Sequence, residues 1–190
     1  VPAIIAMTAS SLYNMVDSIF IGQGVGPLAI SGLALTFPLM NLGAAFGSLV
    51  GVGASTTISV LLGQKNYDVA QKVLGNVIVL NLMIGVVYMI TTLLFLDEIL
   101  YFFGASADTI GYARDYMQII LIGNCITHMY FGLNAVIRSS GFPRFSMHAT
   151  ILTVILNTIL DPLFIYGFGW GIKGAAFATI LSQSVSLVWQ

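Results

Sequence analysis

Charged residues are scarce in this sequence. Asp, Glu, Lys and Arg make up 7% of its 190 residues, whereas soluble domains carry roughly 25%. A chain with so little charge and with 58% hydrophobic residues cannot cover a water-facing surface, so it is a membrane protein. The formal net charge of -1 gives no indication of a nucleic-acid partner, and we expect none.

Cysteine is almost absent as well. The single cysteine, Cys125, excludes an internal disulfide framework and any metal site built from several cysteines. Cys125 lies within an apolar run, where a cysteine behaves as a small buried hydrophobe. We therefore expect no redox or metal chemistry at this residue, and no bound cofactor.

The abundant apolar residues fall into about six segments, most of them near the length of about 20 residues that a spanning helix needs. Glycine, proline and charged residues separate the segments. The expected helices cover residues 2–21, 28–62, 69–96, 112–137, 146–166 and 174–190. The second segment is long for one span, and we expect Pro38 to bend it. The pattern predicts an all-α polytopic membrane protein that crosses the lipid bilayer six times.

The few basic residues predict how these helices are oriented. Four of the six Lys and Arg residues lie in or beside two loops, 63–68 and 138–145. Basic residues favour the cytoplasmic side of a membrane. We therefore expect both loops to be cytoplasmic and the protein to be a multi-pass component of the cell (inner, cytoplasmic) membrane.

Small residues follow a regular spacing on the second segment. Gly43, Gly47, Gly51 and Ser55 recur every four positions, which places them on one helix face. Such a stripe allows helix backbones to approach closely. It predicts a contact between two helices rather than a functional site.

Two carboxylates stand in the apolar segments where carboxylates are least expected. Asp17 lies in the first segment and Asp161 in the fifth, whereas the other five acidic residues lie in or beside loops. An aspartate in the middle of a spanning helix costs about 2.5–3.5 kcal/mol on the insertion scale. Either partner groups compensate this cost, or function requires the carboxylates.

Polar neighbours accompany both carboxylates. Asn14 precedes Asp17 by three positions and Asn157 precedes Asp161 by four, so each amide lies on the helix face of its carboxylate. Helical rise places both carboxylates roughly 8 Å below the outer helix ends. Thr179 enters the sixth segment at a similar depth. If the first, fifth and sixth helices pack together, these side chains form one polar cluster.

The composition of this cluster suits either of two coupling ions. Two neighbouring buried carboxyl groups can take up and release protons. Carboxylate, amide and hydroxyl oxygens can also hold sodium, and Pro162 would free a backbone carbonyl beside Asp161 as a further oxygen ligand. A purely structural role, with both aspartates tied up in hydrogen bonds between helices, is the alternative.

Four stretches of the sequence resemble one known family of transporters. "MVDSIFIG", "NAVIRSSGFPR", "NTILDPLFIYG" and "GIKGAAFAT" are similar, in this order, to motifs of the multidrug and toxic compound extrusion (MATE) family. The resemblance implies one six-helix lobe, the amino-terminal one, of a transporter with two such lobes. The sequence lacks an initiator methionine and closes within an apolar run, so we expect a longer parent polypeptide that carries the second lobe.

The resemblance also implies roles for individual residues. Asp17, Asn157, Asp161 and Thr179 fall on the positions of the cation-coupling site of the family, which could be a sodium site. The backbone of Ala175 would be a further ligand.

Other residues carry weaker expectations. Pro2 resembles the proline at which the first helix of the family bends. Tyr13 and Asn14 neighbour the first carboxylate, and we expect them to line a cavity. His128 stands in the middle of the fourth segment, where it could face the cavity or form a hydrogen bond within the helix packing.

The function expected from residues and resemblance together is an antiporter. It would export small organic, in particular cationic, compounds by alternating access, driven by sodium or protons. A lipid-linked oligosaccharide flippase of related fold is an alternative, although no basic residue stands deep within a segment to bind a pyrophosphate. An intramembrane aspartyl protease is a remote alternative, because the Tyr-Asp and Gly-x-Gly-Asp motifs of such proteases are absent around Asp17 and Asp161. We therefore expect no enzyme.

Overall fold

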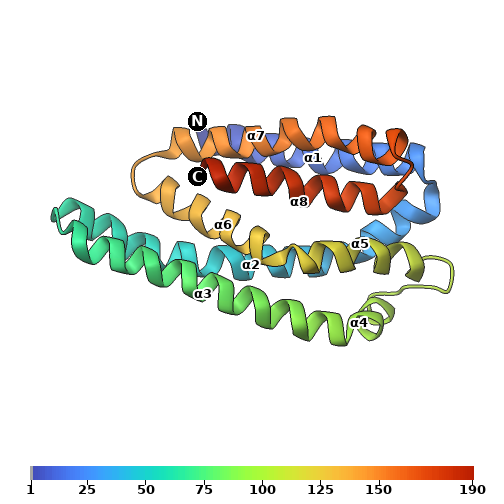
Figure 1. The fold of residues 1–190 in the computed structure, drawn as a ribbon, viewed down its shortest axis with the longest axis horizontal. Coiled ribbons are helices and arrows are strands. Elements are labelled where there is room, and N and C mark those ends of the chain that lie inside the picture. Colours follow the sequence, from blue (N-terminus) through green and yellow to red (C-terminus); the bar gives the residue numbers. More distant parts are fainter. Residues whose placement is uncertain (1) are drawn as a thin grey trace.

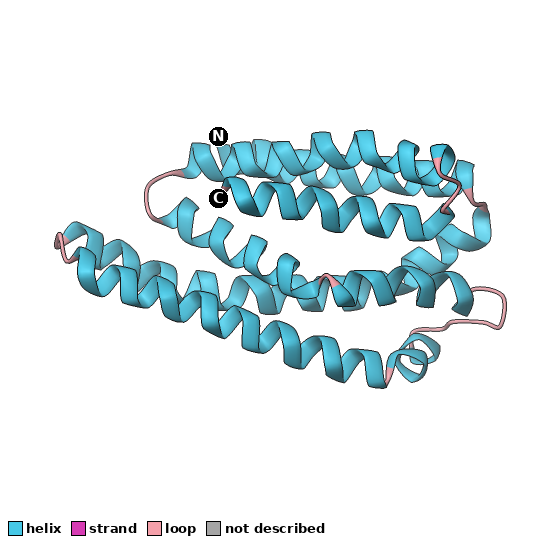
Figure 2. Cartoon of the chain, viewed as in Figure 1, coloured by secondary structure: helices cyan, strands magenta, loops and turns pink. Residues whose placement is uncertain are grey.

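The chain folds into helices throughout the part that the structure describes. The computed structural model describes residues 2–190, and within this range every regular element is a helix (Figure 2). The all-α fold class expected from the sequence is confirmed. The elements in chain order are α1 (Pro2–Gly24), α2 (Pro27–Gly63), α3 (Tyr67–Leu94), α4 (Leu96–Phe102), α5 (Ile110–Ile122), α6 (Asn124–Ser139), α7 (Pro143–Pro162), the π-helix η1 (Leu163–Gly167) and α8 (Gly171–Trp189).

Proline and glycine mark the turns between long helices. Pro27 and Pro143 stand at the first positions of α2 and α7, where the missing N–H of proline has no helical partner to lose. Gly26 and Gly141 precede them with φ angles of 123° and 93°, a conformation that side chains with a Cβ rarely adopt. These residues reverse the chain and send it back along the preceding helix.

The helices form two groups that face each other. α1, α7 and α8 lie side by side, and α2, α3 and α6 form the second group (Figure 1). α5 contacts both α2 and α8 and so connects the groups near one end of the molecule. This arrangement brings the two aspartate-bearing helices, α1 and α7, into direct contact.

The glycine stripe of α2 lies against α6, as its spacing predicts. A Cβ added to Gly51 would lie 2.3 Å from the carbonyl oxygen of Gly132, and one added to Gly47 would lie 2.9 Å from Cα of His128. Backbones this close leave no room for side chains. Gly47 and Gly51 of the stripe therefore form a helix contact, while Gly43 also lines a cavity between the two helix groups.

Several helices meet the requirements for crossing a membrane. Among the described residues, α2, α3, α8 and the continuous run of α7 and η1 are long and apolar enough, and α5 with α6 adds a fifth span if the bent pair counts as one. The turn after α2 and the loop between α6 and α7 lie at the same end of the molecule (Figure 1). The two basic loops thus share a side, and we call the opposite end, where α1, η1 and α8 meet, the outer end.

The fourth expected segment differs from the sequence prediction. Residues 112–137 were expected to form one helix, but α5 and α6 meet at Gly123 with a bend of 60°. A Cβ on Gly123 would lie 2.4 Å from Cδ1 of Ile180. The close approach of α8 explains why glycine stands at the bend, and glycine also weakens a helix.

The three prolines expected to bend helices behave differently. α2 continues as one helix through Pro38. α7 remains α-helical through Asp161 and Pro162, and the irregular backbone follows as the π-helix η1. The side chain of Pro2 lies outside the described residues, so the bend expected there stays a prediction. The irregularity near Asp161 therefore lies on its outer side rather than at the carboxylate itself.

Candidate functional site

The two membrane aspartates meet in the structure. Asp17 on α1 is 5% exposed and Asp161 on α7 is fully buried. The two carboxyl groups lie close enough to interact electrostatically. Two ionised carboxylates that are buried near each other repel. A proton or a small cation at the pair would relieve this repulsion.

Asn157 connects the pair to the third helix of the site. Its Nδ2 donates to Oδ1 of Asp161 over 3.2 Å and to Oγ1 of Thr179 on α8 over 3.4 Å. Asn157 and Thr179 are 1% and 3% exposed. One amide therefore holds a carboxylate of α7 and a hydroxyl of α8 in a fixed relation.

Tyr13 completes the chain of hydrogen bonds. Its hydroxyl group shares a bond of 3.0 Å with Oγ1 of Thr179. Tyr13 lies one turn before Asp17 on α1, so α1 contacts the site through both a carboxylate and a phenol. The residues expected from the sequence, Asp17, Asn157, Asp161 and Thr179, are brought together as a single cluster on α1, α7 and α8, and we call this set the carboxylate site.

The carboxylate site keeps unused acceptor oxygens. Oδ1 of Asp17, Oδ2 of Asp161 and Oδ1 of Asn157 are buried without a hydrogen-bond partner in the described part of the chain. Buried polar atoms normally have partners, so these oxygens are where a proton or a cation would bind. The described residues contain no group of three or more His, Cys, Asp or Glu side chains that could hold a metal ion. Carboxylate, amide and hydroxyl oxygens are ligands of the type that hard cations prefer.

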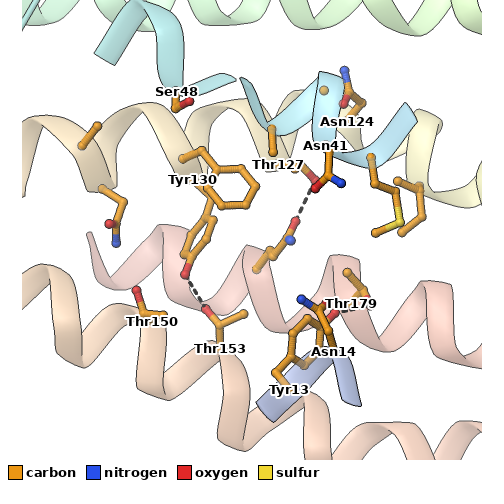
Figure 3. A pocket seen from close by; sticks show the side chains of 18 of the residues that line it. Tyr13, Asn14, Asn41, Ser48, Asn124, Thr127, Tyr130, Thr150, Thr153 and Thr179 are labelled. Carbon is orange, nitrogen blue, oxygen red and sulfur yellow. Dashed lines mark hydrogen bonds between the residues drawn. The ribbon is translucent and has the colours of Figure 1, made fainter. Parts of the chain in front are cut away.

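A cavity of about 600 Å³ lies between the two helix groups. Figure 3 shows Tyr13, Asn14 and Thr179 at one wall and Asn41 and Asn124 at the other. Tyr13 and Asn14 therefore line a cavity, as expected. Neither aspartate lies on its wall. Tyr13 and Thr179 stand at the wall. Thr179 is hydrogen-bonded to Asn157, which in turn is hydrogen-bonded to Asp161 behind the wall.

The cavity wall is polar but almost without charge. Arg138, on the last turn of α6, is the one charged side chain among its described lining residues. Aromatic rings contribute much of the remaining surface, including Phe37, Tyr88, Tyr130 and Phe131. Arg138 was expected only as a topology signal at the cytoplasmic loop. Its helix end reaches the cavity because α6 turns toward α7 after the bend at Gly123.

Hydrogen bonds among hydroxyl and amide groups tie the helices together around the cavity. The Thr153 hydroxyl on α7 lies within hydrogen-bond distance of the Tyr130 hydroxyl, at 3.2 Å (Figure 3), and of the Ser186 hydroxyl, at 2.7 Å. Thr127 on α6 donates to Oε1 of Gln183 on α8 over 2.7 Å. Sequence reasoning missed these residues because Ser and Thr are common in membrane helices and their spacing carries no distinctive signal.

The structure also shows where His128 and Ala175 lie. His128 is fully buried, its Nδ1 lies 3.0 Å from the Asn124 carbonyl oxygen and its ring packs 5.9 Å from the ring of Tyr88. It lies in the contact of α6 with α2 and α3 and is not among the cavity-lining residues, which favours the packing alternative. Ala175 is buried in the core of the outer end. The backbone ligand expected at Ala175 stays a prediction.

Comparison with known proteins assigns the family. The family model described as MatE matches residues 2–163. The chain belongs to the MatE family. It is 34% identical to the multidrug export protein MepA of Staphylococcus haemolyticus (strain JCSC1435), over 97% of this chain and 41% of that protein. The chain thus spans well under half the length of this relative. Because MatE relatives are export proteins, the hypothesis of an intramembrane protease is set aside.

Solved MATE structures share this fold. A crystal structure of MATE in the bent conformation gives a TM-score of 0.91 at 33% identity and covers 100% of this chain and 42% of that one. A second match is a MOP superfamily transporter from Pyrococcus furiosus Vc1, whose binding pocket is described as having reverse polarity. Its TM-score is 0.90 at 34% identity, and the match covers 98% of this chain and 41% of that one. The MatE chain therefore has the fold of one lobe of these transporters.

Proposed function

We propose that this MatE chain is the ion-coupling lobe of an antiporter that exports small organic, in particular cationic, compounds. The observation that carries the proposal is the pair of buried aspartates, Asp17 and Asp161. Asn157 and Thr179 join Asp161 to the Tyr13 hydroxyl on the cavity wall. A structural role alone would not require unpaired carboxylate oxygens. Sodium or a proton is the coupling ion, and no cofactor takes part.

Ion binding would act on the contacts between helices. A proton or sodium ion at the carboxylate pair changes which oxygens of Asp17 and Asp161 remain free to accept bonds. Asn157 and Thr179 then exchange partners, and α1 and α8 shift relative to α7. Because Tyr13 and Thr179 belong to the cavity wall, such a shift changes the shape of the cavity and releases the cargo. The ion gradient drives the cycle through this differential binding.

The chemistry of the wall supports organic cations as cargo. Aromatic rings such as Tyr88 and Tyr130 attract cations through their π faces, most strongly where water is excluded. The second lobe of the same polypeptide would supply the opposite wall of the central pathway. Loops 63–68 and 138–145 would face the cytoplasm, with the protein in the cytoplasmic membrane.

Arg138 gives one observation in favour of the flippase alternative. A guanidinium binds phosphate well, and the Arg138 guanidinium lines the cavity at the end near the two basic loops. A single exposed arginine beside a wall of neutral side chains is nevertheless a weak pyrophosphate site. The exporter therefore remains the better-supported function.

The decisive experiment measures efflux of a fluorescent lipophilic cation from cells that express the full-length parent. Asp161→Asn should abolish efflux at matched membrane expression, because an amide can neither take up the proton nor balance a sodium ion. Asp108→Asn, in an exposed loop, is the matched control and should leave efflux unchanged. Collapsing the sodium gradient and the proton gradient in turn identifies the ion. Unchanged efflux in Asp161→Asn would contradict the proposal, and no efflux from the wild type would favour the flippase.

A further inference from the structure

Buried isoleucines lie on the outer side of the carboxylate site. Four residues beyond each aspartate stands one of them, Ile21 on α1 and Ile165 on η1, and α8 adds Ile172 two turns before Thr179. They are 0%, 4% and 4% exposed and belong to one hydrophobic cluster. The spacing places each above the polar side chain of its own helix. We call these three isoleucines the outer plug.

The backbones around the outer plug lie close together. A Cβ on Gly24 would lie 2.6 Å from Cγ2 of Ile165, and one on Gly174 would lie 2.8 Å from the backbone carbon of Phe164. α1, η1 and α8 therefore approach one another as closely as glycine allows. The three helices that carry the carboxylate site converge again at its outer end.

Tyr166 fastens η1 to α1 beside the plug. Its hydroxyl donates to the carbonyl oxygen of Phe20 over 3.0 Å, and the two rings pack edge to face with centroids 6.4 Å apart. Phe20 lies one turn beyond Asp17, next to Ile21. The bond spans the junction that would have to open if ions were to pass between α1 and η1.

The opposite side of the carboxylate site is polar. Tyr13 and Asn157 stand four residues before the two aspartates, and Gln183 stands four residues after Thr179. Tyr13, Thr179 and Gln183 line the cavity. The carboxylates therefore have apolar side chains on their outer side and a chain of hydrogen-bonding groups on their cavity side.

From this layering we infer that the outer plug, held by the Tyr166–Phe20 bond, seals the carboxylate site so that its coupling ion enters and leaves only through the cavity. The inference rests on the proposed function. An ion that leaves its hydration shell needs replacement oxygens along its way. Tyr13, Thr179 and Gln183 offer side-chain oxygens toward the cavity, whereas the three isoleucine side chains of the outer plug offer none. Tyr166 is a positioning residue, because it acts on the seal and touches neither ion nor cargo.

The seal would keep the ion gradient coupled to export. Ions that reached the pair directly from the outer surface could continue into an inward-facing cavity, and the gradient would dissipate without any cargo moving. With the outer plug in place, an ion from the outer side can reach the carboxylates only when the cavity itself faces outward. Breaking the seal should therefore produce a leak, and not merely a slower transporter.

The test uses the full-length parent reconstituted in liposomes. An imposed sodium or proton gradient is followed with an ion-sensitive dye in the absence of cargo. Ile165→Ser should raise this cargo-independent ion flux and lower coupled efflux. Ile159→Ser on α7, a position that is 60% exposed, makes the same chemical change outside the plug and should leave both unchanged. A folded Ile165→Ser protein without added leak would overturn the inference.

Tyr166→Phe keeps the test decisive if the serine variant fails to fold. The substitution preserves the ring packing on Phe20 and removes one hydrogen bond, which should raise the leak roughly fivefold. Leak and lost coupling at normal thermal stability support a seal. Reduced efflux without leak would show that Tyr166 only stabilises the helix contact, and would overturn the inference. If wild-type efflux proves independent of both gradients, the proposed function fails, an outcome distinct from an intact seal in a coupled transporter.

Discussion

At the scale of single residues, the Thr179 side chain connects the carboxylate site to the cavity wall. Its hydroxyl oxygen lies within hydrogen-bond distance of both Tyr13 and Asn157. A hydroxyl has one proton to donate and two lone pairs to accept with, so the oxygen can satisfy both neighbours at once. Through Thr179, a change at the buried carboxylates can reach the wall of the cavity.

Tyr13→Phe tests this connection. The substitution keeps the ring at the cavity wall and removes the bond to Thr179, worth about 1 kcal/mol, so we expect efflux to fall roughly fivefold. Tyr67→Phe, at an exposed position near the start of α3, is the matched control. Efflux of a lipophilic cation at equal membrane expression measures the effect. Equal efflux from both variants would mean that the bond does not contribute to coupling.

Arg138 permits a prediction about cargo charge. As the one charged described side chain on the cavity wall, it should bind carboxylate-bearing cargo and repel plain cations. Arg138→Gln should therefore lower the efflux of a zwitterionic compound and leave that of a monocation equal or higher. Arg144→Gln is the control, because it removes the same charge from the first turn of α7, and Arg144 is not among the residues that line the cavity. A parallel loss of both cargoes in Arg138→Gln would indicate a general role in folding or insertion instead.

At the scale of elements, glycines determine how closely the helices pack. α2 carries two glycines two positions apart that face different surroundings. A Cβ on Gly51 meets the carbonyl oxygen of Gly132 at 2.3 Å, whereas one on Gly53 meets nothing within 4 Å. The same substitution at the two sites thus separates packing from intrinsic helix propensity.

Gly51→Ala should destabilise the protein by about 1–3 kcal/mol, because the backbone of α6 must move to make room. Gly53→Ala should be neutral or stabilise the helix by up to about 1 kcal/mol, since alanine favours helices. Thermal unfolding of the purified proteins in the same detergent gives the comparison. Equal melting temperatures for the two variants would argue against the close contact of α2 with α6.

The break between α5 and α6 and the π-helix η1 are the two irregular elements. The bend at Gly123 directs α6 toward α7 and places its last turn beside the cavity. η1 begins two residues after Asp161 and contributes Ile165 to the outer plug. π-helical turns occur frequently at functional sites, and here the turn aligns Ile165 and Tyr166 with the end of α1.

At the scale of the whole molecule, the chain corresponds to less than half of its relatives. The cavity lies between α1, α7 and α8 on one side and α2 and α6 on the other, so it is contained in this lobe. Alternating access, in contrast, needs a partner against which the lobe can move. In the proposed transporter, the second lobe would supply the wall that completes the central pathway.

We expect residues 1–190 alone to bind cargo but not to export it. Membranes containing the isolated chain should retain binding of a fluorescent cation that Tyr13→Ala weakens, because the cavity wall belongs to the lobe. Efflux should require the rest of the parent polypeptide, supplied in one chain or co-expressed. Export by the isolated chain would instead indicate that two copies assemble into a transporter.

The sequence by itself determined the class of protein and singled out Asp17 and Asp161 as candidate site residues. Scarce charge and long apolar segments suffice for the class, and a carboxylate is costly enough to bury in a membrane that the two aspartates are informative. That they cluster with Asn157 and Thr179 was conditional on how the first, fifth and sixth helices pack. The motifs around Asp17 and Asp161 also indicated the family that the comparisons confirmed.

Only the tertiary structure decided what surrounds these residues. The bend at Gly123, the cavity position of Arg138 and the packing role of His128 depend on which helices approach each other, and helical spacing does not specify a partner. The outer plug is a similar case. Ile21 and Ile165 look like ordinary lipid-facing residues in sequence, and they become a seal only because α1, η1 and α8 converge beyond the carboxylates.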